Sequence, residues 1–148
     1  MSRITVETTV MAELHKVWEC WTVPNHIVNW NFASKDWHCP WAKNDLREGG
    51  KFSSRMESVD GKMGFDFEGI YDEVHEGRKI AYSLADGRRV EILFEKNGDS
   101  TLVTETFDPE NENPLEMQRA GWQAILDHFK KYTEKLTNKT YQDENNDL

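Results

Sequence analysis

The chain has 148 residues, 37% of them hydrophobic, and its 18 basic and 27 acidic residues give a net charge of −9. This length fits a single domain with its own core, and the charge argues against non-specific binding to nucleic acid or anionic membranes. No apolar run approaches the ~20 residues of a membrane-spanning helix, and an apolar secretion signal is not evident. We therefore expect a cytoplasmic protein without membrane insertion.

The first third of the chain changes its period twice. Residues 4–10 alternate with a period of two, which predicts a strand, and residues 14–21 carry apolar side chains at helical spacing. Pro24 ends this helix and begins a second short one that reaches Trp30. The segment 31–46 has no regular period, so we predict a long aromatic-rich loop near the entrance of a cavity, where it would act as a lid.

Three Asx-Gly pairs divide the middle of the chain, at Asp60-Gly61, Asp86-Gly87 and Asn97-Gly98. This dipeptide is typical of type I′ hairpin turns, whose two central residues both need a positive φ. With further turns at Gly49-Gly50 and Glu76-Gly77, the pairs predict five consecutive strands. These strands cover residues 51–59, 64–74, 79–84, 88–96 and 101–107.

A long amphipathic helix is predicted from Pro114 to Leu136, because apolar side chains recur at every third or fourth position. Successive hairpins followed by one helix predict an α+β fold with a six-stranded antiparallel sheet. Residues 137–148 are polar and acidic, so we expect a disordered tail after a single domain at 1–136.

The sequence contains no recognisable catalytic motif. It has no phosphate-binding glycine loop, nucleophile elbow or local triad, and Cys20 and Cys39 are expected to be reduced thiols. His38 beside Cys39 is a pair of potential metal ligands, but no further ligand has suitable spacing. We predict no catalytic residue, no cofactor and no metal.

One carboxylate in the strands stands apart from the others. Glu91 and Glu95 are expected on the solvated face of the sheet. Glu105 shares a face with Val103, whereas Thr104 lies on the opposite face, and either face fits the interior. A buried Glu105 would need a polar partner or a raised pKa, and both indicate a functional cavity.

Six segments along the chain together form a family signature. They are Val17–Thr22 with Pro24 and Trp30, Asp45–Phe52, Phe67–Val74, Asp86–Arg88, Thr104–Asp108 and Gly121-Trp122. The stretch 4–136 that contains them resembles the homologues of the activator of the ninety-kilodalton heat-shock chaperone's ATPase. That family belongs to the SRPBCC superfamily, with START domains and the birch pollen allergen. Within the resemblance, Gly69 bends the sheet and Gly121 brings the helix close to it.

The resemblance implies a helix-grip fold, in which a curved six-stranded antiparallel sheet wraps around the C-terminal helix. Two short helices would lie between strands 1 and 2. Superfamily members include lipid and hormone binders, and the 17 aromatic residues (6 Trp, 7 Phe, 4 Tyr) fit an aromatic core or a ligand pocket equally well. We interpret the chain as a binder of a small hydrophobic or aromatic molecule, in a cavity between sheet and helix. The predicted lining is Trp30, Phe67, Tyr71, Tyr82, Ile92, Thr104, Glu105 and Trp122.

Two other functions stay open at this point. The first is a co-chaperone that docks its acidic outer face on a heat-shock chaperone. The second is a cyclase or hydrolase of aromatic or polyketide substrates, which needs two titratable groups facing one cavity, with Glu105 and His26 as candidates. The ligand is not identified by the sequence, and a monomer or a weak homodimer is expected.

Overall fold

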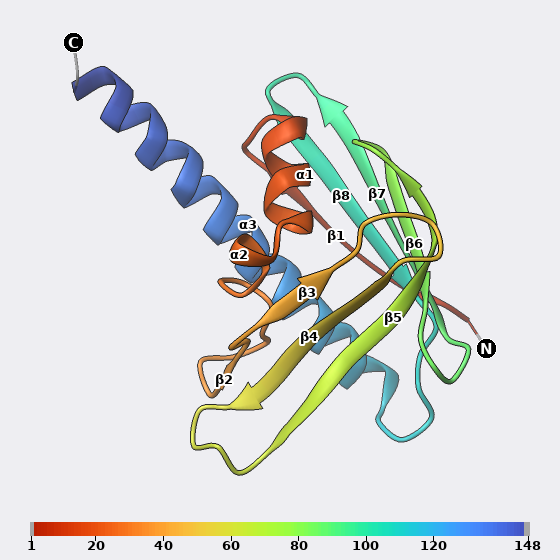
Figure 1. Ribbon diagram of the computed structural model, residues 1–148. Helices are drawn as coiled ribbons and strands as arrows, with labels where there is room; N and C mark the ends of the chain where they lie inside the picture. Colours follow the sequence, from red (N-terminus) through yellow and green to blue (C-terminus); the bar gives the residue numbers. More distant parts are fainter. Residues whose placement is uncertain (1, 147–148) are drawn as a thin grey trace.

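A computed structural model describes residues 2–146 of the chain, and side chains as far as residue 138. It contains one antiparallel sheet in the order β1-β8-β7-β6-β5-β4-β2, with β3 also paired to β4. Figure 1 shows that the sheet is strongly curved and that α3 crosses its concave side, which confirms the α+β helix-grip prediction. The elements are β1 Ile4–Val10, α1 Leu14–Thr22, α2 Pro24–Ile27, β2 Trp37–His38, β3 Ala42–Asn44, β4 Lys51–Ser58, β5 Gly64–His75, β6 Lys79–Ser83, β7 Arg89–Asn97, β8 Ser100–Phe107 and α3 Leu115–Asn146.

The sheet has two short strands beyond the six predicted. The segment 31–46, expected to be a loop, forms β2 and β3 along the outer edge of β4. Strands of two and three residues are too short to produce a visible period in the sequence. Asn44 anchors the segment, because its side-chain N–H donates to the carbonyl of Thr22 (2.7 Å) and its oxygen accepts from the hydroxyl of Tyr71 (2.5 Å).

The three Asx-Gly pairs lie at hairpin turns, as predicted, but these turns are not type I′. Among the described residues a positive φ occurs only at glycines, so the Asp or Asn before each glycine keeps a negative φ. Asp60 and Asp86 accept a hydrogen bond from the backbone N–H two residues later, as in an Asx-turn. In the third turn Asn97 pairs with Ser100, so Gly98 is the first central residue, as in a type II′ turn.

α3 lies along the edge strand β1 and occupies its free backbone groups. The helix buries Leu126 and Phe129 completely, while polar side chains beside this stripe reach the strand. The edge is thereby closed to pairing with another chain, and the helix is fixed relative to the sheet. The four contacts are Arg119 to the carbonyl of Thr5 (2.8 Å), Gln123 to that of Glu7 (3.2 Å), Lys130 to that of Thr9 (2.6 Å) and the N–H of Met11 to Glu134 (2.8 Å).

The C-terminal helix is longer than the sequence pattern predicts. It begins at Leu115 and continues to Asn146, so the predicted end of the helix at Leu136 is wrong, while the disordered tail at 137–148 stays a prediction. The apolar stripe that marks this helix in the sequence ends near Leu136, and the polar sequence that follows continues the helix. Residues 147–148 of that tail lie outside the described residues, and the domain boundary at 136 stays a prediction.

Two glycines of the family signature have opposite surroundings. A Cβ on Gly69 would lie 2.7 Å from a ring carbon of Phe52 and 2.9 Å from the carbonyl oxygen of Ser83. A Cβ on Gly121 would meet nothing within 4 Å, so the predicted close approach of the helix at Gly121 is wrong. The bulge in β5 falls after Gly69, between Tyr71 and Glu73.

These surroundings predict opposite effects of the same substitution. Gly69→Ala overpacks the sheet against Phe52 and should lower the free energy of unfolding by about 1–3 kcal/mol. Gly121→Ala adds a methyl group in open space on a helix and should raise the free energy of unfolding by about 0.5–1 kcal/mol. Urea unfolding followed by circular dichroism measures both, and a loss of stability in Gly121→Ala would contradict the geometry.

Candidate functional site

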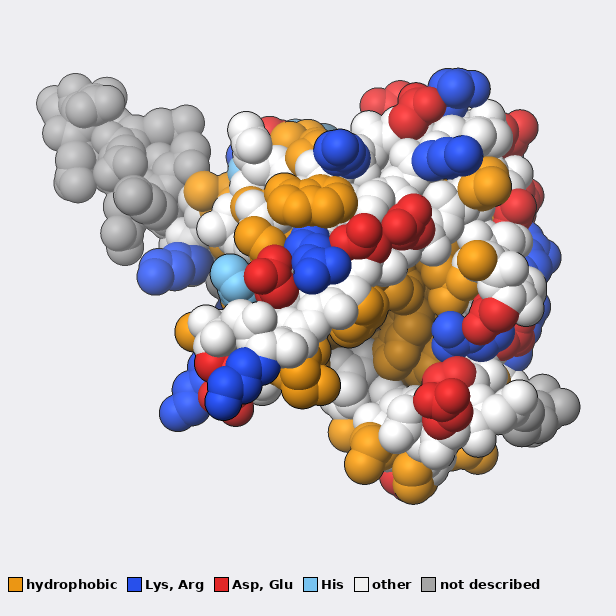
Figure 2. All heavy atoms as spheres, turned by 60° about the horizontal axis from the view of Figure 1, so that its bottom comes forward, with side chains coloured by type: hydrophobic (Ala, Val, Ile, Leu, Met, Phe, Trp, Pro, Cys, Tyr) orange, Lys and Arg blue, Asp and Glu red, His pale blue; other side chains and the backbone are white. Residues whose placement is uncertain are grey.

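A cavity of about 330 Å³ lies between α3 and the concave face of the sheet. Figure 2 looks at the face where it opens and shows a hollow lined by hydrophobic side chains. Well-packed interiors leave few voids larger than one water molecule, and small-molecule sites start at about 300 Å³. The lining comes from the two short helices and the segment after them (Trp21, Ile27, Trp30, Asn31, Lys43, Asn44), from the sheet and its turns (Phe52, Ser54, Met56, Phe65, Phe67, Tyr71, Ile80, Tyr82, Arg88, Glu105) and from α3 (Trp122, Ile125).

The end of the cavity beside α1 and α2 is closed by packed rings. The ring centroids of Trp21, Trp30 and Phe129 are each 4.9 Å from the other two. The indole N–H of Trp30 donates to the backbone carbonyl of Cys20 (2.9 Å), so its polar atom is satisfied within the core. Trp21 and Trp30 are the members of this cluster that line the cavity, and Phe129 packs behind them.

The opposite wall is a second aromatic cluster, on β4, β5 and β6. The ring of Phe52 lies 4.6 Å from that of Tyr82 and 5.2 Å from that of Tyr71. Phe67 links this wall to α3, with its ring 6.3 Å from that of Trp122. The edge-to-face arrangement of most of these pairs is one that aromatic rings prefer. A guest between the two clusters would contact ring surfaces on both sides.

Two tyrosines contribute hydroxyl groups to this wall. The Tyr71 hydroxyl donates to Asn44, whereas the Tyr82 hydroxyl makes no hydrogen bond within the described residues. Burial raises the pKa of both phenols, and for Tyr82 the nearby Glu105 adds to the effect. Both groups are therefore neutral at physiological pH and offer a hydrogen bond without a charge.

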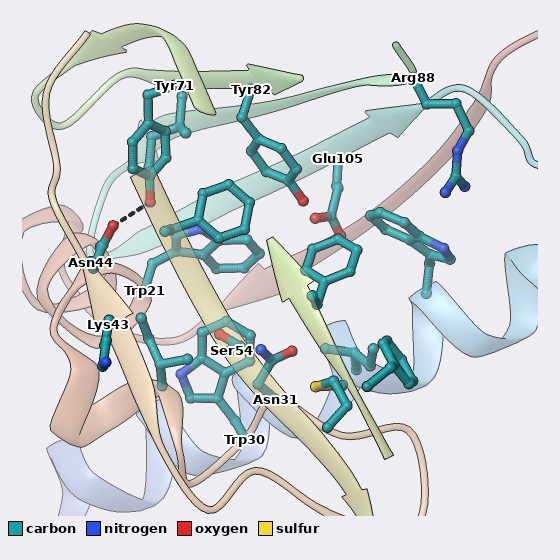
Figure 3. A pocket seen from close by; sticks show the side chains of 18 residues that line it. Trp21, Trp30, Asn31, Lys43, Asn44, Ser54, Tyr71, Tyr82, Arg88 and Glu105 are labelled. Atoms are coloured by element: carbon teal, nitrogen blue, oxygen red, sulfur yellow. Dashed lines mark hydrogen bonds between the residues drawn. The ribbon is translucent and has the colours of Figure 1, made fainter. Parts of the chain in front are cut away.

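Glu105 is the one carboxyl group in the lining formed by the described residues. It points inward from β8 with 6% of its surface exposed, and no described group gives it a hydrogen bond or a salt bridge. Burial alone raises its pKa to about 8, so the acid is mostly protonated at neutral pH. Figure 3 shows its carboxyl group and the Tyr82 hydroxyl directed into the same part of the cavity.

The structure places six of the eight predicted lining residues in the cavity wall and two elsewhere. Ile92 is completely buried in the core, where neighbouring side chains cover it. Thr104 lies on the outer face of β8, because the inward positions of that strand are Val103 and Glu105. The six in the wall are Trp30, Phe67, Tyr71, Tyr82, Glu105 and Trp122. Their role in binding stays a prediction.

His26 does not face the cavity, contrary to the arrangement that an acid–base pair with Glu105 would require. Its Nδ1 lies 2.6 Å from the Tyr132 hydroxyl and its Nε2 3.5 Å from a carboxylate oxygen of Glu19.

The cavity wall also contains residues that the sequence does not predict, among them three on β4, where every second side chain points inward. These three residues are Phe52, Ser54 and Met56. The alternation of hydrophobic and polar residues along β4 is too weak in the sequence to show which face is internal.

A second hollow, of about 640 Å³, lies outside the sheet between α1 and two hairpin turns. Its lining includes the charged Glu13, Glu19 and Lys96, which suits water better than an apolar guest. Among the described residues, no three His, Cys, Asp or Glu side chains gather in a group able to hold a metal ion. No helix in that part of the chain is long and apolar enough to cross a membrane.

Comparison with known proteins identifies the family. The sequence profile described as Activator of Hsp90 ATPase homolog 1-like protein matches residues 11–134, which span both short helices, every strand after β1 and the packed part of α3. The chain belongs to this family. No protein with curated annotation matches the sequence.

Solved structures share the fold of this Hsp90-ATPase-activator-like chain. An AHSA1-like protein from Aeromonas hydrophila is 39% identical, with a TM-score of 0.86, over 92% of this chain and 94% of its own. The protein Chr148 from Cytophaga hutchinsonii is 51% identical, with a TM-score of 0.79 and the same two coverages. A protein from Nitrosomonas europaea is 18% identical with a TM-score of 0.79, over 90% of this chain and 94% of its own, and this likeness concerns the fold alone.

The buried acid predicts a pH dependence of stability. The unfolded chain ionises Glu105 near pH 4.5, whereas the folded protein keeps the proton until about pH 8. The folded state therefore binds more protons in this window, and Glu105 lowers the free energy of unfolding as pH rises. Glu105→Gln removes this effect, so its stability relative to wild type should increase by up to roughly 1.4 kcal/mol per pH unit between those values.

Chemical unfolding of both proteins at pH 5, 6, 7 and 8 measures this difference. Glu95→Gln, on the exposed face of the neighbouring strand β7, is the matched control and should show no such trend. A difference between wild type and Glu105→Gln that does not change with pH would mean that Glu105 is ionised in the folded protein.

Proposed function

We propose that the protein binds a small, uncharged hydrophobic molecule in the cavity between α3 and the sheet. The observation that carries this proposal is an apolar space of about 330 Å³ inside a domain that is otherwise packed. The cavity opens to solvent (Figure 2), and a guest that covers its apolar wall would contribute roughly 25 cal/mol per Å² of apolar surface removed from water.

The wall supports a guest with ring systems. Aromatic clusters lie on both sides, and each ring pair with a guest adds roughly 0.5–1.5 kcal/mol beyond the burial of apolar area. The volume is at the lower end of small-molecule sites, which favours one or two fused rings over a long lipid chain. Phe65, which belongs to the lining, is 50% exposed, so the guest has a path to solvent beside β5.

A co-chaperone role is the second candidate, and the name of the family supports it. The acidic outer face that would dock a basic partner is partly neutralised within the chain. A carboxylate oxygen of Asp66 lies 3.1 Å from the guanidinium of Arg55, and one of Glu73 lies 3.0 Å from Lys79. These pairs leave fewer unpaired carboxylates for a basic partner than the 27 acidic residues of the chain indicate. An unchanged ATPase rate of a heat-shock chaperone with this protein added supports the ligand-binding role instead.

Tetralin, an uncharged molecule of two fused rings, is a suitable probe of the proposed function. Titration followed by ¹⁵N–¹H NMR shifts should show saturable binding. Ser54→Leu should weaken that binding at least about tenfold, because Ser54 is a buried wall residue and the larger side chain fills the space of the guest.

Ser53→Leu is the matched control, since Ser53 is the preceding residue of β4 and faces away from the cavity. It should bind tetralin as the wild type does. Equal weakening in the two variants, or no saturable shift in the wild-type protein, would refute binding in this cavity.

A further inference from the structure

We propose that Tyr82 and Glu105 form a two-donor site that selects ligands carrying a carbonyl oxygen. The inference rests on the proposed ligand-binding function and names the chemical class of the ligand. Both side chains come from the concave face of the sheet, on β6 and β8, and their polar ends are directed into the same part of the cavity (Figure 3).

The polar ends of both side chains lack a protein partner. Glu105 is 6% exposed and Tyr82 is 8% exposed, yet neither makes a hydrogen bond or an ion pair within the described residues. The one fully buried side-chain polar atom without a partner among the described residues is the Thr133 hydroxyl oxygen, so the Tyr82 hydroxyl and the Glu105 carboxyl group are open to the cavity. Two polar groups that reach one largely apolar cavity without a described protein partner are both available to the same ligand atom.

The charged and titratable groups that share the cavity leave this pair neutral. The Tyr71 hydroxyl is engaged with Asn44, and the guanidinium of Arg88 lies 2.7 Å from a carboxylate oxygen of Asp86. Lys43 belongs to the lining, and its ammonium group lies 5.3 Å from the centroid of the Trp41 ring. All lining residues from α1, α2 and α3 are uncharged. Since no cation is paired with Glu105, burial keeps its carboxyl group protonated and able to donate.

A carbonyl oxygen is the acceptor that fits two converging donors. It has two lone pairs, so it takes one hydrogen bond from the phenol and one from the carboxylic acid. A hydrocarbon would leave both donors buried and unsatisfied, which opposes its binding. An ammonium ion would have to lose its hydration in an apolar cavity and would require the ionised acid. The site therefore discriminates by hydrogen bonding, while the aromatic walls supply affinity.

The proton on Glu105 links this selectivity to pH. The acid donates only while it is protonated, and the carboxylate repels a carbonyl oxygen. Affinity for a carbonyl ligand should therefore fall as pH rises through about 8, whereas affinity for a hydrocarbon of the same shape should change little.

Three probes of one skeleton test the inference: 1-tetralone, tetralin and 1-aminotetralin, each titrated by NMR at pH 6.5 and pH 9.5. At pH 6.5 the wild-type protein should bind 1-tetralone about tenfold more tightly than tetralin. At pH 9.5 that preference should disappear. Glu105→Gln keeps a donor without titrating, so it should retain the preference at both pH values. Tyr82→Phe should reduce the preference and still bind tetralin.

The outcomes separate this inference from the function on which it rests. Equal affinity for 1-tetralone and tetralin at pH 6.5 would overturn the two-donor site and leave hydrophobic binding standing. Tightest binding of 1-aminotetralin would overturn it in favour of a cation site on ionised Glu105. Saturable binding of none of the three would overturn both. The comparison of 1-tetralone with tetralin uses the wild-type protein, so the test remains valid even if a variant fails to fold.

Discussion

The hydrogen bonds between α3 and the edge strand β1 are the constraint on which the rest of the structure depends. They hold the helix along one edge of the sheet, where Arg119, Gln123 and Lys130 donate to backbone carbonyls of alternate residues of β1. Because the sheet twists and curls away from that edge, β4 and β5 lie on the far side of the helix (Figure 1). The side chains then do not fill the whole space between α3 and the concave face of the sheet, and the unfilled part is the cavity. Its position follows from how the helix is fixed, and its chemistry follows from the side chains that face it.

That chemistry is unusual in a single respect. Rings and aliphatic side chains form most of the wall, and any domain of this size has enough of them to close its core. A carboxylic acid with no partner among the described residues is different, because its burial opposes folding at every pH where the unfolded chain is ionised. The neighbouring Tyr82 hydroxyl adds a second donor that reaches the cavity without a hydrogen bond to a described residue. The pair is better explained by a ligand than by the stability of the fold.

The sequence predicts the parts of this architecture that rest on local backbone chemistry. Glycines at the hairpins mark the turns, and the apolar stripe of the C-terminal helix marks the face that packs. It does not predict β2 and β3, which are too short to show a period and depend on β4 as a template. It also misses the helical continuation to Asn146, since the apolar stripe that marks the helix in the sequence ends near Leu136.

The sequence does not determine which face of each strand points into the cavity, and this limits prediction of the candidate site. Trp122 follows from helical periodicity, whereas Trp30 is predicted on the second short helix and lies in the turn after it, because α2 ends at Ile27. A strand offers two faces, and Thr104 lies on the face of β8 that points away from the cavity. The sequence indicates that a buried Glu105 would point to a functional cavity. Only the three-dimensional structure shows that no described residue forms a hydrogen bond or a salt bridge with it.

The most direct test of ligand binding in this cavity is the position of a bound guest, measured by intermolecular nuclear Overhauser effects between tetralin protons and the protein. The guest should contact the indole rings of Trp30 and Trp122 and the ring of Tyr82, which lie in the turn after α2, on α3 and on β6. Contacts confined to Leu14 and Trp18 in the outer hollow beside α1, or to Leu93 on the exposed face of the sheet, would contradict it.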